Sequence, residues 1–107
     1  MLSALIGLVR SAGYDARGFA SAEEFLGCGM VPSPACIVTD VQMPGMSGIE
    51  LKQHLDACQF STPVILITAL HEPGLEERAL ASGVVCFLRK PFEGGTLIGC
   101  IERALET

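Results

Sequence analysis

The sequence predicts an α/β fold, a doubly wound parallel sheet with helices on both faces. Three apolar runs lack the alternation of a half-exposed strand, which is typical of parallel strands covered on both sides. Segments with helical spacing separate these runs, and strand–helix–strand connections of this kind are right-handed crossovers. The 107 residues suffice for one core, and no repeat or linker divides them. We therefore expect one domain over residues 1–107.

The N-terminal part of the chain predicts a helix, a weak strand and a short second helix. Apolar residues at helical spacing over residues 2–9 predict a helix that ends near Gly13. Tyr14–Phe19 is the weak strand candidate. Ser21 and Glu24 stand at the spacing of a capping box, which favours a helix directly after them.

The three apolar strands are predicted at Ala35–Asp40, Pro63–Thr68 and Val84–Leu88. A helix is expected after each of them. A loop rich in glycine and proline leads from the first strand to a helix from about Ile49 to Cys58. The second strand precedes a helix through Ala81, and an amphipathic helix closes the chain.

A polar residue stands at the end of each strand or just past it: Asp40, Thr68 and Lys90. Because the carboxyl ends of parallel strands share one edge of a sheet, we expect the three residues to converge in a crevice there. A carboxylate, a hydroxyl and an ammonium group fit phosphoryl transfer. Asp40 can act as the nucleophile, while Thr68 and Lys90 can bind the phosphoryl oxygens. Taken singly, each residue also has a structural interpretation. Asp40 would cap a turn, Thr68 would be an ordinary residue at a strand end, and Lys90 would be a solvated surface charge.

Composition and charge argue against several classes of function. The net charge of −5, the pI near 4.8 and the scattered Lys and Arg residues argue against direct nucleic-acid binding. The apolar runs are too short to span a bilayer. The apolar start lacks a basic leader and predicts a helix rather than a signal peptide. We expect no membrane association and a cytoplasmic location.

The cysteines and histidines give no metal-binding pattern. The five cysteines are odd in number and lack CxxC spacing: Cys28, Cys36, Cys58, Cys86 and Cys100. Reduced, structural thiols are the favoured interpretation. His54 and His71 have no partner at ligand spacing and are expected to be solvated surface residues.

Five sequence segments together resemble the receiver domains of two-component response regulators, in particular the subfamily of nitrogen-fixation regulators. They are Val38–Gly48, Ile67–Ala69, Phe87–Phe92, residues 11–14 and residues 19–26. The resemblance covers Leu2 to about Glu106.

The resemblance implies a flavodoxin-like fold in which a histidine kinase transfers a phosphoryl group to Asp40. It implies that Thr68 and Lys90 bind that group, and that Thr68 and Phe87 act as the switch. It also implies Mg²⁺ held by Asp40 and the main-chain carbonyl of Gln42, and an output domain or partner protein as the receiver of the signal. Such a chain is a switch rather than an enzyme, with self-dephosphorylation as its only turnover. We further predict a cis peptide bond between Lys90 and Pro91.

The chain departs from the family at its start, where the first strand and its two acidic metal ligands are missing. The metal site is therefore expected to be incomplete, with weak Mg²⁺ binding and slow or absent phosphorylation. A receiver-shaped interaction module that works without phosphorylation is the alternative function. An unrelated flavodoxin-like enzyme ranks last, because no phosphate-binding glycine loop stands near the first strand.

The missing strand also leaves the Asp40 strand with an open apolar edge. Such edges recruit other strands. Tyr14–Phe19 is therefore predicted to repair the edge, either within the chain or by exchange between two chains in a homodimer.

Overall fold

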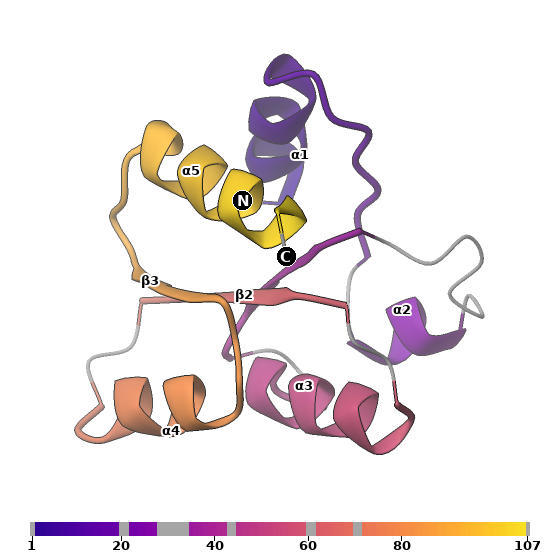
Figure 1. Cartoon of the computed structure of the whole chain (residues 1–107), viewed down its shortest axis with the longest axis vertical. Coiled ribbons are helices and arrows are strands. Elements are labelled where there is room, and N and C mark those ends of the chain that lie inside the picture. Colours follow the sequence, from indigo (N-terminus) through magenta and orange to yellow (C-terminus); the bar gives the residue numbers. More distant parts are fainter. Residues whose placement is uncertain are drawn as a thin grey trace.

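A computed structural model places three strands in one sheet between two layers of helices (Figure 1). It describes residues 2–19, 22–27, 35–42, 45–59, 62–69 and 72–106. In chain order the elements are α1 (Leu2–Ser11), α2 (Ala22–Gly27), β1 (Ile37–Asp40), α3 (Gly48–Ala57), β2 (Val64–Thr68), α4 (Leu75–Ala81), β3 (Cys86–Arg89) and α5 (Gly94–Leu105).

The sheet is parallel with the order β1-β2-β3, so β2 is paired on both edges. The register aligns Ile37 with Val64 in the first pair and Ile65 with Cys86 in the second. Every residue of β2 is buried. Figure 1 shows why: α1 and α5 cover one face of the sheet, and α3 and α4 cover the other.

Each face of the sheet has its own apolar core. The core toward α3 and α4 contains nine buried residues: Ile37, Val41, Leu51, Leu55, Val64, Leu66, Leu75, Ala79 and Val84. The core toward α1 and α5 contains Ile65, Cys86, Leu97, Cys100, Ile101 and Ala104. In β2, Val64 and Leu66 therefore face the first core and Ile65 faces the second, as the pleat of a strand requires. This arrangement confirms the predicted doubly wound α/β class.

The predicted and observed bounds of the three strands differ by no more than two residues at each end. The third strand begins at Cys86 rather than Val84, yet Val84 remains in the core. The short helix α2 is present, but Ser21 of its predicted capping box lies outside the described residues.

The predicted strand Tyr14–Phe19 is wrong, because these residues form no strand. A parallel strand needs a neighbour for its backbone groups, and among the described residues the sheet contains only β1, β2 and β3. Packing holds the segment instead. Tyr14 packs against the α1/α5 core, and the Phe19 ring centroid lies 5.2 Å from that of Phe25. Within the described ranges, Tyr14–Phe19 thus does not repair the edge of β1, and exchange between chains stays a prediction.

Four cysteines are described, and all are free thiols. Cys58 is exposed, whereas Cys36 lies beside the α1/α5 core that contains Cys86 and Cys100. Burial, with a smaller contribution from the neighbouring Cys86, raises the pKa of Cys36 and of Cys100 to about 11. Both thiols therefore stay neutral near pH 7 and pack as small apolar groups.

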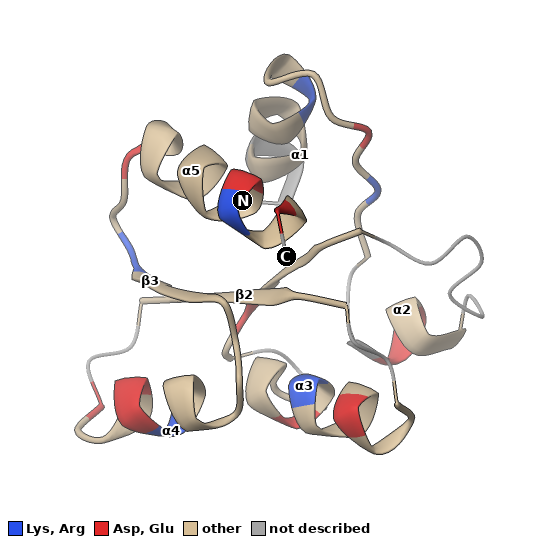
Figure 2. Cartoon of the chain, viewed as in Figure 1, with Lys and Arg blue, Asp and Glu red and all other residues tan. Residues whose placement is uncertain are grey.

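Charged residues occur on the helices and connecting segments, and Lys52 of α3 is buried while it pairs with Asp56. Figure 2 shows the described Lys and Arg residues spread over several helices and connecting segments, with acidic residues on α2, α3 and α4. In the part of the chain that the structure describes, each helix is too short or too polar to cross a membrane.

Two leucines of α4 provide a matched test of the core. Leu75 is 2% exposed and Leu80 is 50% exposed. We expect Leu75→Ala to lower the free energy of unfolding by about 2–5 kcal/mol, because it opens a cavity in the α3/α4 core. Leu80→Ala should change it by less than about 0.5 kcal/mol. Urea denaturation measures both, and equal effects would contradict the assignment of the core.

Candidate functional site

The carboxyl ends of the three strands lie at one edge of the sheet. Asp40 ends β1 and Thr68 ends β2, while Lys90 follows the last residue of β3. The register aligns Asp40 with Ile67, and Thr68 with Arg89. The predicted convergence at the strand ends is therefore present in the fold.

Asp40 and Lys90 are in direct contact. The Lys90 Nζ donates to Asp40 Oδ2 at 2.9 Å, and the side chains of Lys90 and Asp40 are 19% and 30% exposed respectively. The other carboxylate oxygen, Oδ1, accepts the main-chain N–H of Gln42 at 3.2 Å. Partial burial reduces the screening that weakens surface ion pairs. Both oxygens of Asp40 are thus held in place beside a cation.

Thr68 joins this pair through its main chain. Its carbonyl oxygen accepts the Lys90 N–H at 2.8 Å, and the residue is 0% exposed. The Lys90–Pro91 peptide bond is cis, as predicted. The structure therefore ties the backbone of Lys90 to the end of β2 and its side chain to Asp40.

Phe87 lies on β3, partly buried against the α3/α4 core. Arg89 stands two residues later, and its Cζ lies 5.7 Å from the centroid of the Phe87 ring. Its Nη2 also lies 3.6 Å from Oε1 of Glu76 on α4. Arg89 therefore links the aromatic ring to α4, a role that could not be predicted because no local sequence pattern around Arg89 indicates it.

The turn that follows Asp40 is tight and ends in a capped helix. The Gly48 N–H donates to the Val41 carbonyl at 2.9 Å, and a Cβ at Gly48 would collide with the Asp40 carbonyl oxygen and the Leu66 side chain. Ser47 and Glu50 form a reciprocal capping box at the start of α3. Only glycine allows the helix to begin so close to Asp40.

Glu23 also reaches this turn, because its Oε2 accepts the Met46 N–H at 2.9 Å. The capping-box spacing of Ser21 and Glu24 predicts a helix here and gives no sign of a contact with the turn. The helix is present, but Glu23 contacts the segment after Asp40. No local signal could have shown this, since Glu23 and Met46 are 23 positions apart.

The oxygen ligands for a metal ion are few among the described residues. Asp40 offers one carboxylate and Gln42 one main-chain carbonyl, and within the described ranges no group of three His, Cys, Asp or Glu residues could hold a metal. Mg²⁺ prefers six oxygens in an octahedral array. These residues alone do not form a complete magnesium site. His54 is exposed, with 3.7 Å between its Nε2 and the Sγ of Cys58, and His71 lies outside the described residues.

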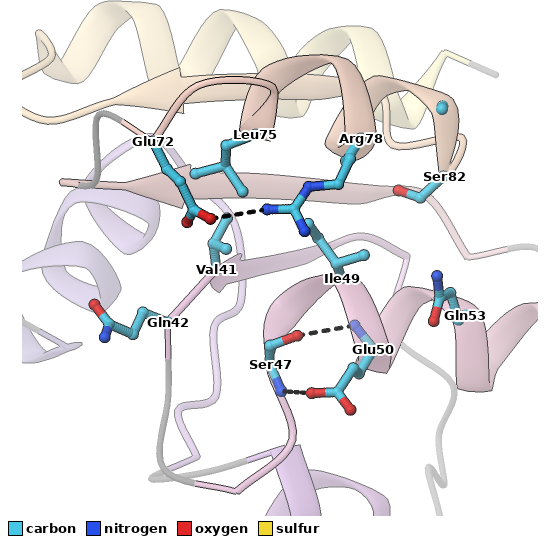
Figure 3. Close-up of a pocket in the computed structure, with 11 residues that line it drawn as sticks. Val41, Gln42, Ser47, Ile49, Glu50, Gln53, Glu72, Leu75, Arg78 and Ser82 are labelled. Carbon is cyan, nitrogen blue, oxygen red and sulfur yellow. Dashed lines mark hydrogen bonds and ion pairs between the residues drawn. The ribbon is translucent and has the colours of Figure 1, made fainter.

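A hollow of about 720 Å³ lies next to this region, between α3 and α4 (Figure 3). Val41, Ile49 and Leu75 supply apolar surface, and Arg78 and Glu72 face each other with 3.5 Å between Nη2 and Oε1. Gln42 reaches the hollow from the Asp40 turn, but Asp40, Thr68 and Lys90 do not line it. The hollow borders the strand-end site and is separate from it.

Comparison with known proteins identifies the family. Residues 1–102 match the family model of the response regulator receiver domain. The chain belongs to the receiver-domain family. Receiver domains work in two-component signal transduction, generally as switches rather than enzymes, and they typically bind Mg²⁺.

The relatives agree with this assignment. The transcriptional regulatory protein FixJ of Bradyrhizobium diazoefficiens is 39% identical over 98 residues, which are 92% of this chain and 48% of FixJ. Nodulation protein W of the same organism is 35% identical over 106 residues, which are 99% of this chain and 47% of that protein. The chain spans about half the length of the curated relatives it matches. The predicted likeness to nitrogen-fixation regulators is confirmed.

Solved structures show the same fold. The response regulator StyR matches with a TM-score of 0.89 and 39% identity, covering 99% of this chain and 54% of StyR. The crystal structure of FixJ-N matches with a TM-score of 0.86 and 35% identity, covering 97% of this chain and 83% of FixJ-N. The flavodoxin-like fold predicted from the family resemblance is thereby confirmed.

The close packing at Gly48 can be tested against a glycine in open space. We expect Gly48→Ala to lower the free energy of unfolding by about 1–3 kcal/mol, because the added methyl group overpacks the turn. A methyl group at Gly99 in α5 would have no neighbour within 4 Å, so Gly99→Ala should be neutral or stabilise by up to about 1 kcal/mol. Urea denaturation gives both values, and loss of stability only in Gly99→Ala would contradict the packing described.

Proposed function

We propose that Asp40 accepts a phosphoryl group from a histidine kinase. The observation that carries the proposal is the contact of Lys90 Nζ with Asp40 Oδ2 at the carboxyl edge of the sheet. A carboxylate in this position is an available nucleophile, and the adjacent ammonium group can bind a phosphoryl oxygen as negative charge develops. Family membership independently supports the same assignment.

In the proposed reaction, the phosphoryl group moves from a histidine of the kinase to Asp40. An oxygen of the Asp40 carboxylate forms a bond to phosphorus as the bond between phosphorus and the kinase histidine nitrogen breaks. The electron pair of that bond stays on the imidazole nitrogen. The Lys90 ammonium group, already beside Asp40, then pairs with the new phosphoryl oxygens, and the Thr68 hydroxyl is proposed to bind another.

We propose that Thr68 and Phe87 convert this local change into a change of partner surface. The main-chain N–H of Lys90 donates a hydrogen bond to the Thr68 carbonyl, and Lys90 follows Phe87 by three residues along the chain. The Phe87 ring contacts Arg89, which reaches α4 through Glu76. Movement at Thr68 would therefore alter packing between β3 and α4, shifting a two-state equilibrium rather than creating a new fold.

The partners that we propose are a histidine kinase and an output domain or partner protein in the cytoplasm. Relatives such as FixJ are about twice as long as this chain and are named transcriptional regulators. DNA contact would then belong to the output, since this chain carries a net charge of −5.

Mg²⁺ is proposed to bind weakly, through Asp40 and the Gln42 carbonyl. This incomplete set of ligands also favours a second candidate function, a receiver-shaped interaction module that works without phosphorylation. In that case the partner surface around β3 and α4 is used, but Asp40 is not modified.

Incubation with acetyl phosphate and Mg²⁺ separates the two functions. We expect intact-mass measurement to show one added phosphoryl group on the parent chain and none on Asp40→Asn. Lys90→Ala should slow the reaction on the order of 10²-fold, because a preorganised charge partner is lost. An unmodified parent chain after prolonged incubation would support the interaction module instead.

The open edge of β1 leads to a proposal about self-association. Ile37 and Val41 direct their N–H groups toward β2, with bonds of 2.9 and 2.8 Å to Pro63 and Ile67 carbonyls. The backbone of Val38 between them consequently faces the other edge, where the described residues supply no paired strand. We propose that two copies of the chain associate along this edge.

Static light scattering over a range of concentrations tests this association. We expect the mean mass to rise from monomer toward dimer, and Val38→Pro to suppress the rise because proline removes the outward N–H. A parent chain that stays monomeric at every concentration would rule out the proposed dimer.

A further inference from the structure

A hydrogen bond connects helix α2 to the turn that follows Asp40. The main-chain N–H of Met46 donates to Oε2 of Glu23 at 2.9 Å. Glu23 stands in the first turn of α2, far from Met46 in sequence. A bond from an amide to a carboxylate is charge-assisted and stronger than a bond between neutral groups. The contact therefore ties the turn to a separate element of the fold.

Gly45 makes this approach possible. Its φ of +77° lies in the left-handed region, and a Cβ at this position would collide with the Glu23 carboxylate. The glycine thus serves two purposes: it turns the chain, and it leaves space for Glu23 beside the Met46 N–H.

Packing fixes the helix that presents Glu23. Phe25 and Leu26 pack against the α3/α4 core, and the Phe25 ring meets Phe19 edge-on. Met46 packs against the same core. Since both partners of the hydrogen bond are anchored by neighbouring apolar contacts, little further ordering is needed to form it.

Three contacts involve the described residues that follow Asp40. The Asp40 carboxylate accepts the Gln42 N–H, Glu23 accepts the Met46 N–H, and the capping box joins Ser47 to the first turn of α3. The first and third contacts are local. The contact from Glu23 comes from a different helix and fixes the segment relative to the rest of the domain.

We propose that Glu23 is a positioning residue for the phosphoacceptor site. It acts by binding the Met46 N–H, four positions after Gln42, whose own N–H orients Asp40 and whose carbonyl is a proposed metal ligand. Glu23 itself touches neither the phosphoryl donor nor the reacting oxygen. Its effect on phosphorylation rests on the proposed function of Asp40, whereas its hold on Met46 does not.

Amide hydrogen exchange at Met46, followed by NMR, tests the hold directly in the whole chain. We expect Glu23→Ala to accelerate exchange of this amide by about tenfold or more, because a hydrogen bond to a charged acceptor is lost. Glu23→Gln keeps a neutral acceptor and should give an intermediate rate. Glu102→Ala is the control, an exposed glutamate on α5, and should leave Met46 exchange at the parent rate.

The rate of phosphorylation by acetyl phosphate tests the positioning role in the same variants. We expect Glu23→Ala to slow labelling of Asp40 by about tenfold, Glu23→Gln to restore part of the rate and Glu102→Ala to retain it. Urea denaturation of each variant identifies any general loss of folding.

The exchange and labelling measurements test separate parts of the proposal. Unchanged Met46 exchange in Glu23→Ala would show that the hydrogen bond does not hold the turn and would overturn the proposal. Faster exchange with an unchanged labelling rate would overturn the positioning role. If the parent chain itself is not labelled, the proposed function of Asp40 fails, and Met46 exchange alone then decides whether Glu23 holds the turn.

Discussion

The burial of β2 is the constraint on which the rest of the structure depends. This strand is paired on both edges, and each of its residues is buried between two helical layers. Parallel pairing on both sides brings the ends of β1 and β3 to the same edge as its own end. Asp40 and Lys90, which are 50 positions apart, meet there at 2.9 Å. The chemistry at the sheet edge follows from this pairing.

Strand β3 combines the chemical and the mechanical parts of the proposed switch. Lys90 follows its last residue and pairs with Asp40, while Phe87 and Arg89 lie on the strand and contact the α4 side. The Thr68 carbonyl accepts the Lys90 N–H, so the proposed change at the end of β2 would act directly on this short segment. The exposed ion pair between Arg89 and Glu76 is weak, as surface pairs are, so it would oppose the proposed movement of the Phe87 ring only slightly.

The turn after Asp40 shows how closely chemistry and backbone geometry are linked. Gly48 allows α3 to begin against the Asp40 carbonyl, and Ser47 with Glu50 caps that helix. The sequence predicted a turn rich in glycine and proline at this point. It did not show that Gly45 makes room for Glu23, because that requirement arises from a helix that lies earlier in the chain and packs beside the turn.

The sequence by itself determined the three buried strands, the helices between them and the positions of Asp40, Thr68 and Lys90 at the strand ends. Apolar runs and helical periodicity are local properties of the sequence. The geometry of a parallel sheet then places the three strand ends at one edge. Only the tertiary structure decided that Tyr14–Phe19 is not a strand, since a strand requires a neighbour to pair with. It alone also joined Glu23 to Met46 and Arg89 to Glu76. Such contacts depend on how separate helices pack against the sheet, and the periodicity of the sequence does not predict that packing.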